Sequence, residues 1–392
     1  MQRVTAALVT YQGAHLIDDL AETMGMLPDV SCVVYDSGSS DGTVRLLEEK
    51  IPHAKVISGR NLGFGFGNNR CLEKIETEYT LLLNSDARID SGSLSLLVQF
   101  LDANPSYAGV QPLIRLWDWK LVTASRGVFL TQYGEAWDSG FMHLEPFVSR
   151  VPFEVPAITA AVALWRTRVI KSAGGFDQNF FMYFEDADLS LRLQAKGWKL
   201  AVVPSAVAEH MTGASSSRME ALLWEVSSSV RIFKRYFNRE DYLWKLFCRE
   251  LRVLLGRMIR GGNPVPRLKA FLKALGKRVE TVEIPERIFS MVYGSPGDMP
   301  MKRRLPDCRS PFLYGSVASP WTAAKLNSDE ASITLESTGH TATGVILSGE
   351  GELLQRFVVP AGGKRNYLLA VPGRVVYIKC HMCEDSVKVE IV

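Results

Sequence analysis

The sequence has little cysteine, almost no net charge and no long apolar run. Its six cysteines are scattered over 392 residues, too few for a disulfide framework, so we expect a reducing compartment. A formal net charge of +3 argues against nucleic acid as a partner. The longest apolar run, Val155–Trp165, is about half of the roughly 18–20 residues that cross a bilayer. With no cleavable signal ahead of the first apolar segment, we expect a cytoplasmic protein.

The composition is that of a folded protein. Hydrophobic residues make up 47% of the chain and charged residues 22%, which excludes a disordered or fibrous protein. The length predicts two or three domains, each with a substantial core.

The first 215 residues alternate short apolar runs with longer amphipathic ones. The apolar runs predict strands at Val4–Val9, Ser31–Tyr35, Ala54–Ile57, Tyr79–Leu83 and Ala108–Ile114. The amphipathic stretches predict helices at Leu16–Leu27, Thr43–Lys50, Asn68–Glu76 and Ser93–Ala103. This alternation indicates an α/β domain with a mostly parallel sheet, which binds ligands at the carboxyl ends of its strands.

Two further regions are expected after residue 215. Residues 216–293 read as basic amphipathic helices, which either pack on the first domain or approach anionic lipid. Gly294–Pro311 reads as a linker, and residues 312–392 predict a small β-sandwich-like module of short strands between glycine-containing turns. Nothing in that module chooses between glycan binding, self-association and contact with a partner enzyme.

An acidic motif follows the second predicted strand. Asp36-Ser37-Gly38-Ser39-Ser40-Asp41-Gly42 lies between a strand and a helix, where Asp36 could accept hydrogen bonds from a base or ribose. Ser40 or Asp41 could equally cap the next helix.

A glycine-rich motif follows the third predicted strand. In Asn61-Leu62-Gly63-Phe64-Gly65-Phe66-Gly67-Asn68-Asn69, alternate glycines allow close backbone approach to a ligand, and the asparagines supply amide donors. An ordinary turn is the alternative, and no Walker-type lysine follows.

A third motif, Asn84-Ser85-Asp86, ends an apolar strand. Strand alternation would point the side chains of Asn84 and Asp86 the same way, and oxygen ligands suit Mg²⁺ or Mn²⁺. A strand-end turn is the alternative.

The fourth motif, Phe184-Glu185-Asp186-Ala187-Asp188, places three carboxylates at the head of a helix. The helix dipole alone favours acids there. Adjacent carboxylates among aromatics could instead hold a general base that deprotonates a hydroxyl.

Taken in order, these motifs resemble the family-2 glycosyltransferases with a GT-A fold, the Rossmann-like nucleotide-binding fold, and in particular the rhamnosyl- and galactofuranosyl-transferring branch. Further matching pieces are Val9-Thr10-Tyr11 and Gly174-Gly175-Phe176-Asp177. The resemblance spans about residues 3–215. It implies a GT-A catalytic domain followed by a helical segment and a small C-terminal all-β domain.

The resemblance also implies roles for individual residues. The nucleotide-sugar donor would be bound by Thr10, Tyr11, Asp36, Asn61, Gly63, Asn68, Asn84, Ser85 and Asp86. A Mg²⁺ or Mn²⁺ ion would be held by Asp86 and His210, and Asn84 departs from the family's Asp at the first metal-motif position. Asp186 would be the catalytic base, and the acceptor would be contacted by Trp165, Glu185 and Asp188. Arg192 would approach the diphosphate.

The activity implied is metal-dependent transfer of a hexose with inversion at the anomeric carbon. The first candidate donor is dTDP-rhamnose, and the second is UDP-galactofuranose. The acceptor would be a hydroxyl of a cell-surface polysaccharide or of a lipid-linked glycan precursor. Contact with the inner face of the membrane and homo-oligomerisation are left open. A nucleotidyltransferase should carry a glycine-rich loop with Arg or Lys directly after the first strand, and it is disfavoured because Tyr11-Gln12-Gly13-Ala14-His15 contains neither Arg nor Lys. A binding protein without turnover is disfavoured because Asp86 and Asp186 are both present.

Overall fold

A computed structural model describes most of the chain, in two stretches. The first is residues 2–291 without 118, 142, 145–150, 212–217, 238–239, 260 and 290; the second is residues 321–391 without 326–328, 338–341, 362, 372–374 and 383–386. The predicted linker Gly294–Pro311 lies outside the described residues. The chain divides into two compact units, one of residues 1–114, 124–140 and 149–300, the other of residues 115–123, 141–148 and 301–392. Each is described by itself.

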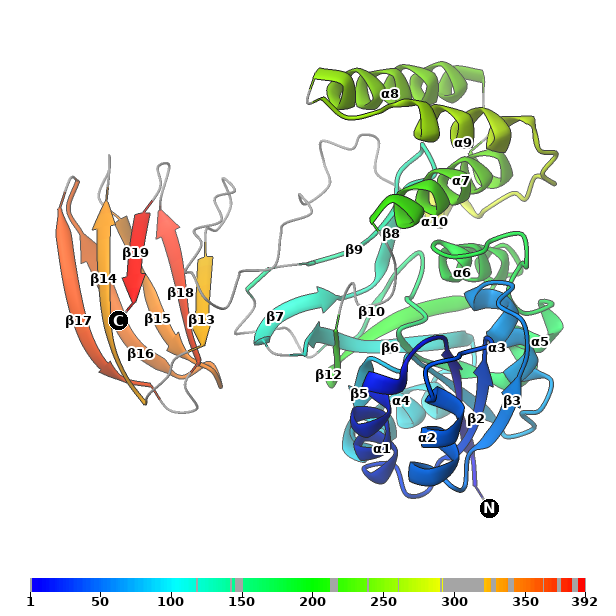
Figure 1. The fold of residues 1–392 in the computed structure, drawn as a ribbon, viewed down its shortest axis with the longest axis horizontal. Helices are drawn as coiled ribbons and strands as arrows, with labels where there is room; N and C mark the ends of the chain where they lie inside the picture. The colour runs from blue at the N-terminus through cyan, green and yellow to red at the C-terminus, as the bar shows by residue number, and fades with distance from the viewer. Residues whose placement is uncertain are drawn as a thin grey trace. The chain divides into compact units, whose positions relative to one another are not determined.

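A ten-stranded sheet organises the first unit (Figure 1). Its strands are β1 (Val4–Thr10), β2 (Ser31–Asp36), β3 (Lys55–Ser58), β4 (Tyr79–Leu83), β5 (Ala87–Ile89), β6 (Tyr107–Leu116), β7 (Trp119–Ser125), β10 (Phe153–Glu154), β11 (Val162–Arg166) and β12 (Lys199–His210). The order is β10-β12-β6-β11-β4-β1-β2-β3, with β5 on β12 and β7 on β6. A separate two-stranded ribbon joins β8 (Val128–Leu130) to β9 (Ala136–Asp138).

The sheet is parallel in one half and contains antiparallel pairs in the other. Strands β1, β2, β3 and β4 run parallel, whereas β11 is antiparallel to β4 and β6, and β12 is antiparallel to β5 and β10. The prediction of a mostly parallel sheet is therefore correct only for the first four strands. Strand β4 is buried along its whole length, as expected of a strand covered on both faces.

Helices alternate with the first strands, as the sequence predicted (Figure 1). They are η1 (Ala14–Leu16), α1 (Ile17–Gly25), α2 (Thr43–Lys50), α3 (Phe64–Leu72), α4 (Ser91–Ala103), α5 (Thr167–Ser172) and α6 (Glu185–Ala195). Helix α3 begins four residues earlier than predicted, because the glycines that suggested a loop lie inside its first turns. Helix α4 starts at an Asp90 cap that accepts a hydrogen bond from the Ser93 amide at 2.7 Å.

The basic helical region belongs to the first unit. It contains α7 (Arg218–Tyr236), α8 (Glu240–Ile259), α9 (Val265–Gly276) and the short α10 (Glu286–Phe289). One apolar core joins α7 to α6 and to the ribbon; its members include Val226, Val230 and Phe233 of α7, Ala187 and Leu191 of α6 and Leu130 of β8. Among the residues that the structure describes, no helix combines the length and apolar character needed to span a bilayer.

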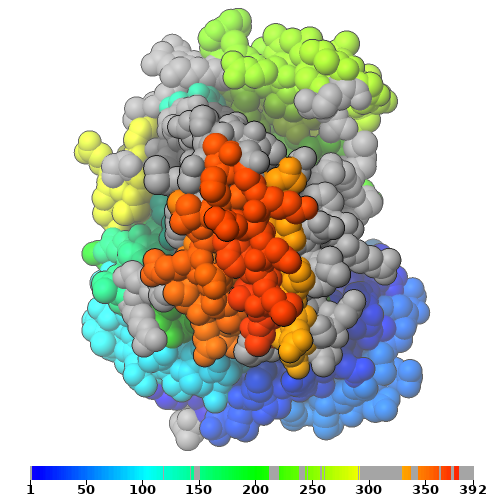
Figure 2. All heavy atoms as spheres, turned by 90° about the vertical axis from the view of Figure 1, so that its left-hand side faces the viewer, coloured from blue at the N-terminus to red at the C-terminus, as the bar shows by residue number. Residues whose placement is uncertain are grey.

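The second unit contains a small two-sheet module. One sheet has the order β13 (Trp321–Lys325), β18 (Val375–Met382), β15 (Ala342–Ser348) and β16 (Leu353–Val359); the other has β17 (Lys364–Ala370), β14 (Glu330–Ser337) and β19 (Val387–Ile391). The outer strands β16 and β17 are drawn in orange to red in Figure 2. A single core contains Ile333 of β14 together with Ile346 of β15 and Phe357 of β16, so the two sheets pack face to face as a small sandwich.

The second unit also contains residues from the hairpin of β6 and β7. The Trp119 ring packs edge-on against that of Tyr377 with centroids 6.1 Å apart, and the Leu121 amide donates to the Tyr377 hydroxyl at 3.3 Å. Lys120 pairs with Glu350 at 2.5 Å. These contacts could not be predicted from the sequence, because the residues that meet are more than 200 positions apart along the chain.

Candidate active site

The carboxyl ends of β1 and β2 meet at one edge of the parallel half-sheet. Thr10 and Asp36 are register partners there, and the Thr10 hydroxyl donates to Asp36 Oδ2 at 3.0 Å. Asp36 also accepts hydrogen bonds from the Gly38 and Ser39 amides and from the Ser39 hydroxyl at 2.6 Å. Both Thr10 and Asp36 are buried, so this carboxylate shapes the loop after β2. Direct contact of either residue with a nucleotide stays a prediction.

Tyr11 is the exposed member of this group. Its side chain is 51% accessible, and the next residue, Gln12, has a left-handed backbone with φ of 49°. The Gln12 amide donates to the Ser39 hydroxyl at 2.8 Å, and its side chain exchanges hydrogen bonds with Ser40. The two loops therefore hold each other at the edge where Tyr11 presents an open aromatic face.

The glycine-rich motif packs against protein atoms, and contact of Gly63 with a nucleotide-sugar donor stays a prediction. Gly63 has φ of 106°, and a Cβ there would lie 2.4 Å from the Phe181 carbonyl oxygen. A Cβ on Gly67 would lie 2.9 Å from the Val9 side chain and 3.0 Å from the Tyr35 ring. These glycines let α3 lie close to the sheet and to the segment before α6.

The asparagines of this motif are also used by the protein. Asn61 accepts a hydrogen bond from the Gly63 amide at 3.2 Å, and buried Asn68 donates to the Phe64 carbonyl at 3.1 Å. The Asn69 side chain makes two hydrogen bonds with the backbone of Phe176, each of 2.8 Å. Asn69 Nδ2 donates to the Phe176 carbonyl, and the Phe176 amide donates to Asn69 Oδ1. Asn69 thus joins the glycine-rich motif to Gly174-Gly175-Phe176-Asp177, a link that sequence reasoning missed.

Asn84, Ser85 and Asp86 form a turn between β4 and β5. The Ala87 amide donates to the Asn84 carbonyl at 3.1 Å, so the strand alternation expected of Asn84 and Asp86 does not hold. The two side chains converge nonetheless, because Ala87 pairs with His210 at the end of β12. His210 Nε2 lies 3.1 Å from Asp86 Oδ1 and 3.4 Å from Asn84 Nδ2. The tertiary structure therefore brings together the three polar groups that the sequence nominated for a cation.

This group suits a divalent cation. Two ligand atoms at right angles on Mg²⁺ or Mn²⁺ would be about 3 Å apart for bonds of about 2.1 Å, close to the separation observed between Asp86 and His210. The buried Asn84 Oδ1 has no hydrogen-bond partner. Across the described residues no three His, Cys, Asp or Glu side chains are placed to hold a metal ion together. Asp86, His210 and Asn84 would therefore leave further ligand positions to the substrate and to water.

The acidic motif begins α6 after a strained backbone. Tyr183 and Phe184 both have left-handed φ values, of 70° and 67°, which is rare for bulky residues and typical of functional sites. Glu185 is buried, and its Oε2 has no hydrogen-bond partner. Asp186 is partly exposed and accepts hydrogen bonds from the Ala187 amide at 2.7 Å and the Ala160 amide at 3.1 Å.

The segment before β11 connects the acidic motif to the turn after β4. Asp186 Oδ2 accepts from the amide of Ala160, while the carbonyl of the next residue, Ala161, accepts from the Asn84 amide at 2.9 Å. Consecutive Cα atoms are about 3.8 Å apart. Asp186 and the Asn84 turn are therefore anchored on neighbouring residues of one short segment, although they lie about a hundred positions apart in sequence.

Burial raises the pKa values of both carboxyl groups at the head of α6. For Glu185 the desolvation, reinforced by the adjacent Asp186 charge, raises the pKa to about 8. For Asp186 desolvation again raises the pKa, but the amides of Ala160 and Ala187 and the Thr159 hydroxyl oppose it. The amide and hydroxyl donors around Asp186 favour its charged form, which is the form that a general base requires.

Two predicted acceptor contacts are wrong. Trp165 is fully buried in β11 with its ring against Gly109, where a Cβ would lie 2.5 Å from the ring, so it cannot stack on a sugar. Asp188 is also fully buried, and both its oxygens are occupied: Oδ1 by Arg235 at 2.5 Å and Tyr236 at 2.9 Å, Oδ2 by Arg192 at 2.8 Å.

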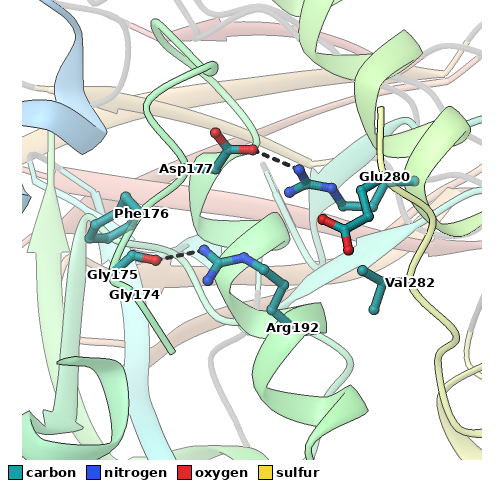
Figure 3. Close-up of a pocket in the computed structure, with 8 residues that line it drawn as sticks. Gly174, Gly175, Phe176, Asp177, Arg192, Glu280 and Val282 are labelled. Atoms are coloured by element: carbon teal, nitrogen blue, oxygen red, sulfur yellow. Dashed lines mark hydrogen bonds and ion pairs between the residues drawn. The ribbon is translucent and has the colours of Figure 1, made fainter. Parts of the chain in front are cut away.

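Arg192 is part of the same internal network and not of a diphosphate site. It donates to the carbonyls of Ala173 and Gly175 at 2.7 and 2.6 Å, as Figure 3 shows for Gly175. Asp177 accepts from Arg231 and Arg235, each at 2.8 Å. The cavity of about 200 Å³ in Figure 3 is lined by Asp177, Arg192 and Arg235 of this network, which joins α6 to α7.

A second cavity of about 200 Å³ lies between the segment before α6 and the helices α7 and α9. Its aromatic wall is Phe181 and Trp224, whose ring centroids are 4.9 Å apart. Its basic wall includes Lys273 and Lys277. Phe181 lies four residues before Glu185 in the sequence. A cavity with an aromatic wall and a basic wall is chemically suited to an anionic, partly apolar ligand.

The model of the family "Glycosyltransferase like family 2" matches residues 4–226, more than half of the chain. The chain belongs to glycosyltransferase family 2. Its mixed α/β sheet is the GT-A catalytic fold, as the resemblance implied, and the protein is a glycosyltransferase.

Known relatives extend the comparison. The N-acetylglucosaminyl-diphospho-decaprenol L-rhamnosyltransferase of Mycobacterium tuberculosis is 29% identical over 240 residues, which cover 54% of this chain and 76% of the relative. A mannosyltransferase from Pyrobaculum calidifontis, solved with GDP-Man and Mn²⁺, is similar with a TM-score of 0.44, 17% identity and coverage of 69% of this chain and 68% of its own. Staphylococcus aureus TarS 1–349 with UDP-GlcNAc has a TM-score of 0.42, 18% identity and coverage of 74% and 84%.

Proposed function

We propose that this glycosyltransferase moves one hexose from a nucleoside-diphosphate donor to an acceptor hydroxyl, with inversion at the anomeric carbon. The observation that carries the proposal is the anchoring of Asp186 and of the Asn84 turn on Ala160 and Ala161. A base and a cation-binding group so close to one another can act on the two sides of a single sugar.

Asp186 is proposed as the base. Its carboxylate takes the proton of the acceptor hydroxyl while that oxygen forms a bond to the anomeric carbon and the bond from that carbon to the diphosphate oxygen breaks. The nucleoside diphosphate leaves with the bonding electrons. General-base assistance of this kind contributes roughly 10²–10⁴-fold. The Ala160 and Ala187 amides hold the carboxylate in place.

Asp86 and His210, with Asn84, are proposed to hold Mg²⁺ or Mn²⁺. A bound cation of this type neutralises the charge that develops on the departing diphosphate. The unpartnered Asn84 Oδ1 and the approach of His210 to Asp86 support this assignment. Thr10, Tyr11, Asp36 and Ser85 complete the proposed donor side, with Tyr11 as its exposed ring.

The proposed donor is dTDP-rhamnose, with UDP-galactofuranose as the alternative. The proposed acceptor is a glycan on a lipid diphosphate or a growing surface polysaccharide. Support comes from the name of the mycobacterial relative, which is a rhamnosyltransferase acting on a decaprenol-linked diphosphate. The cavity with Lys273, Lys277, Phe181 and Trp224 supports an acceptor that carries an anionic diphosphate next to the sugar.

A donor panel tests the proposal. Nucleoside diphosphate release is measured for dTDP-rhamnose, UDP-galactofuranose, UDP-glucose and GDP-mannose, each with EDTA, Mg²⁺ or Mn²⁺, with and without a synthetic N-acetylglucosaminyl-diphospho-lipid. We expect acceptor-dependent release from dTDP-rhamnose that requires the cation. Release from another sugar alone would correct the donor, and release unaffected by EDTA would remove the cation from the proposal.

A further inference from the structure

Helices α8 and α9 expose an unusual number of large apolar side chains. On α8, Trp244 is 70% and Ile259 86% accessible. The other exposed members are Leu243, Phe247, Leu251, Leu255 and Met258 on α8 and Val265, Leu268 and Leu272 on α9. A contiguous apolar surface on a folded protein usually marks a binding face.

The two helices run antiparallel. Phe247, early in α8, packs its ring on that of Phe271 near the end of α9, with centroids 6.2 Å apart. Glu250, later in α8, pairs with Arg267 near the start of α9 at 2.7 Å. Contacts therefore move forward along one helix as they move backward along the other.

The exposed apolar side chains of both helices lie on the same side of the pair. On α8 the buried positions are Leu246, Glu250 and Leu254, and each is followed directly by an exposed apolar residue, Phe247, Leu251 and Leu255. On α9, buried Arg267 and Phe271 are followed by exposed Leu268 and Leu272. One residue turns the helix by about 100°. The buried positions of the two helices face each other, as the Glu250–Arg267 pair shows. Because the helices are antiparallel, a step of one residue from these positions turns the side chains of both helices to the same side of the pair. The two stripes therefore form one face, here called the α8–α9 face.

Basic side chains border this face. Arg252 follows Leu251 on α8, and Lys269 and Lys273 follow Leu268 and Leu272 on α9; all three are exposed. A second step of about 100° places them at the outer edge of each helix. Of the acidic side chains that the structure describes on these helices, Glu250 is buried in ion pairs with Arg249 and Arg267. The face is thus apolar in the middle and cationic at its rims.

We propose that the α8–α9 face binds the surface of a bilayer that contains anionic phospholipid. Apolar side chains such as Trp244 and Leu251 enter the boundary between headgroups and acyl chains, while Arg252 and Lys269 contact lipid phosphates. A neutral apolar partner would match the centre of the face and leave its cationic rims unpaired, which favours lipid over protein. The proposal concerns membrane binding alone and does not depend on the donor, the acceptor or Asp186.

Vesicle flotation tests the proposal with the full chain. Vesicles are made of phosphatidylcholine alone or of equal parts phosphatidylcholine and phosphatidylglycerol, at low and high salt. We expect flotation with the anionic vesicles, little with the neutral ones, and release as salt screens the rim charges. The triple variant Trp244→Ser, Leu251→Ser, Leu255→Ser should bind about hundredfold more weakly. The pair Arg252→Ser, Lys269→Ser should bind about tenfold more weakly or less at low salt.

Leu368→Ser is the matched control. Leu368 is 77% exposed on β17 of the C-terminal module, so this variant removes a similar apolar side chain outside the α8–α9 face, and its flotation should equal that of the wild type. Thermal unfolding shows whether each variant keeps its fold; all of the substituted side chains are exposed. Equal flotation of the triple variant and wild type would overturn the proposal. So would a wild-type dimer in sedimentation velocity that the triple variant converts to monomer, since a second copy would then cover the face.

Discussion

The two ends of the acidic motif on α6 look alike in sequence and differ completely in structure. Asp188 is buried with Arg192, Arg235 and Tyr236 on its two oxygens. Glu185 and Asp186, three and two residues earlier, face no cation among the contacts described: Glu185 Oε2 is unpartnered, and Asp186 is held only by neutral donors. A carboxylate paired with buried cations stabilises the fold, whereas a carboxylate held only by neutral donors keeps the capacity to bind a proton or substrate.

Asp186→Asn tests the end that lacks a cationic partner and should have the largest effect. The amide keeps the size of the side chain but cannot take a proton, so transfer should fall by roughly 10²–10⁴-fold while donor binding persists. Turnover by nucleotide release and donor affinity by calorimetry are measured on the same preparation. Wild-type turnover would remove Asp186 from the role of base.

Asp188→Ala tests the end that is paired with two arginines. Removing this carboxylate leaves Arg235 and Arg192 with a lost partner in the interior, which should cost about 3–5 kcal/mol of unfolding free energy. Urea unfolding measures the loss. Asp18→Ala, whose carboxylate is exposed in a surface pair with Lys50, is the control and should cost less than about 1 kcal/mol. Equal losses in the two variants would contradict the comparison.

Asp86→Ala tests the proposed cation group. It should weaken Mn²⁺-dependent donor binding by about tenfold or more, because one of few protein ligands is lost. Titration of Mn²⁺ in the presence of nucleoside diphosphate, followed by calorimetry, gives the affinity. An unchanged titration, with the fold intact by circular dichroism, would place the cation elsewhere.

Glu185→Gln sharpens the comparison through pH. The pKa of Glu185 is raised from 4.5 to about 8, so the folded protein holds a proton that the unfolded chain has released between these values. Stability from this group is therefore complete below about pH 4.5 and is lost, by up to about 1.4 kcal/mol per pH unit, as pH rises toward 8. Glu185→Gln should reduce that decline. Thermal unfolding of both proteins from pH 5 to about 8.5 measures it, and parallel curves would show that Glu185 is ionised in the fold.

Much of the first unit could be predicted from the sequence. The strand Tyr79–Leu83 and the helix Thr43–Lys50 are found with their predicted bounds, because hydrophobic periodicity acts locally. The antiparallel pairing of the strands after Tyr107 was not predicted, because a short apolar run does not show in which direction its strand runs in the sheet. The strand pattern of the C-terminal module was also visible, but the hairpin residues Trp119–Leu121 that join its unit were not.

The site was predictable as a set of residues and not as a set of contacts. The sequence nominated Asp186, Asp86 and His210, and the structure adds the contact of His210 with Asp86 and the Ala160 and Ala161 backbone that connects Asp186 to the turn at Asn84. Trp165 and Asp188 were assigned wrongly, because the sequence does not show whether the side chain of a residue near a motif faces a ligand or the core.

The sequence alone determined the family, the order of its motifs and the alternation of strands and helices, because these depend on residue types and spacing along the chain. Only the tertiary structure decided which polar groups remain unpaired and which side of α8 and α9 is shared. Both depend on partners far away in sequence: Arg235 for Asp188, His210 for Asp86, and Phe271 for Phe247. The residue type fixes the chemistry of a side chain, whereas the residues that pack against it in the folded protein decide whether it is free to bind a ligand.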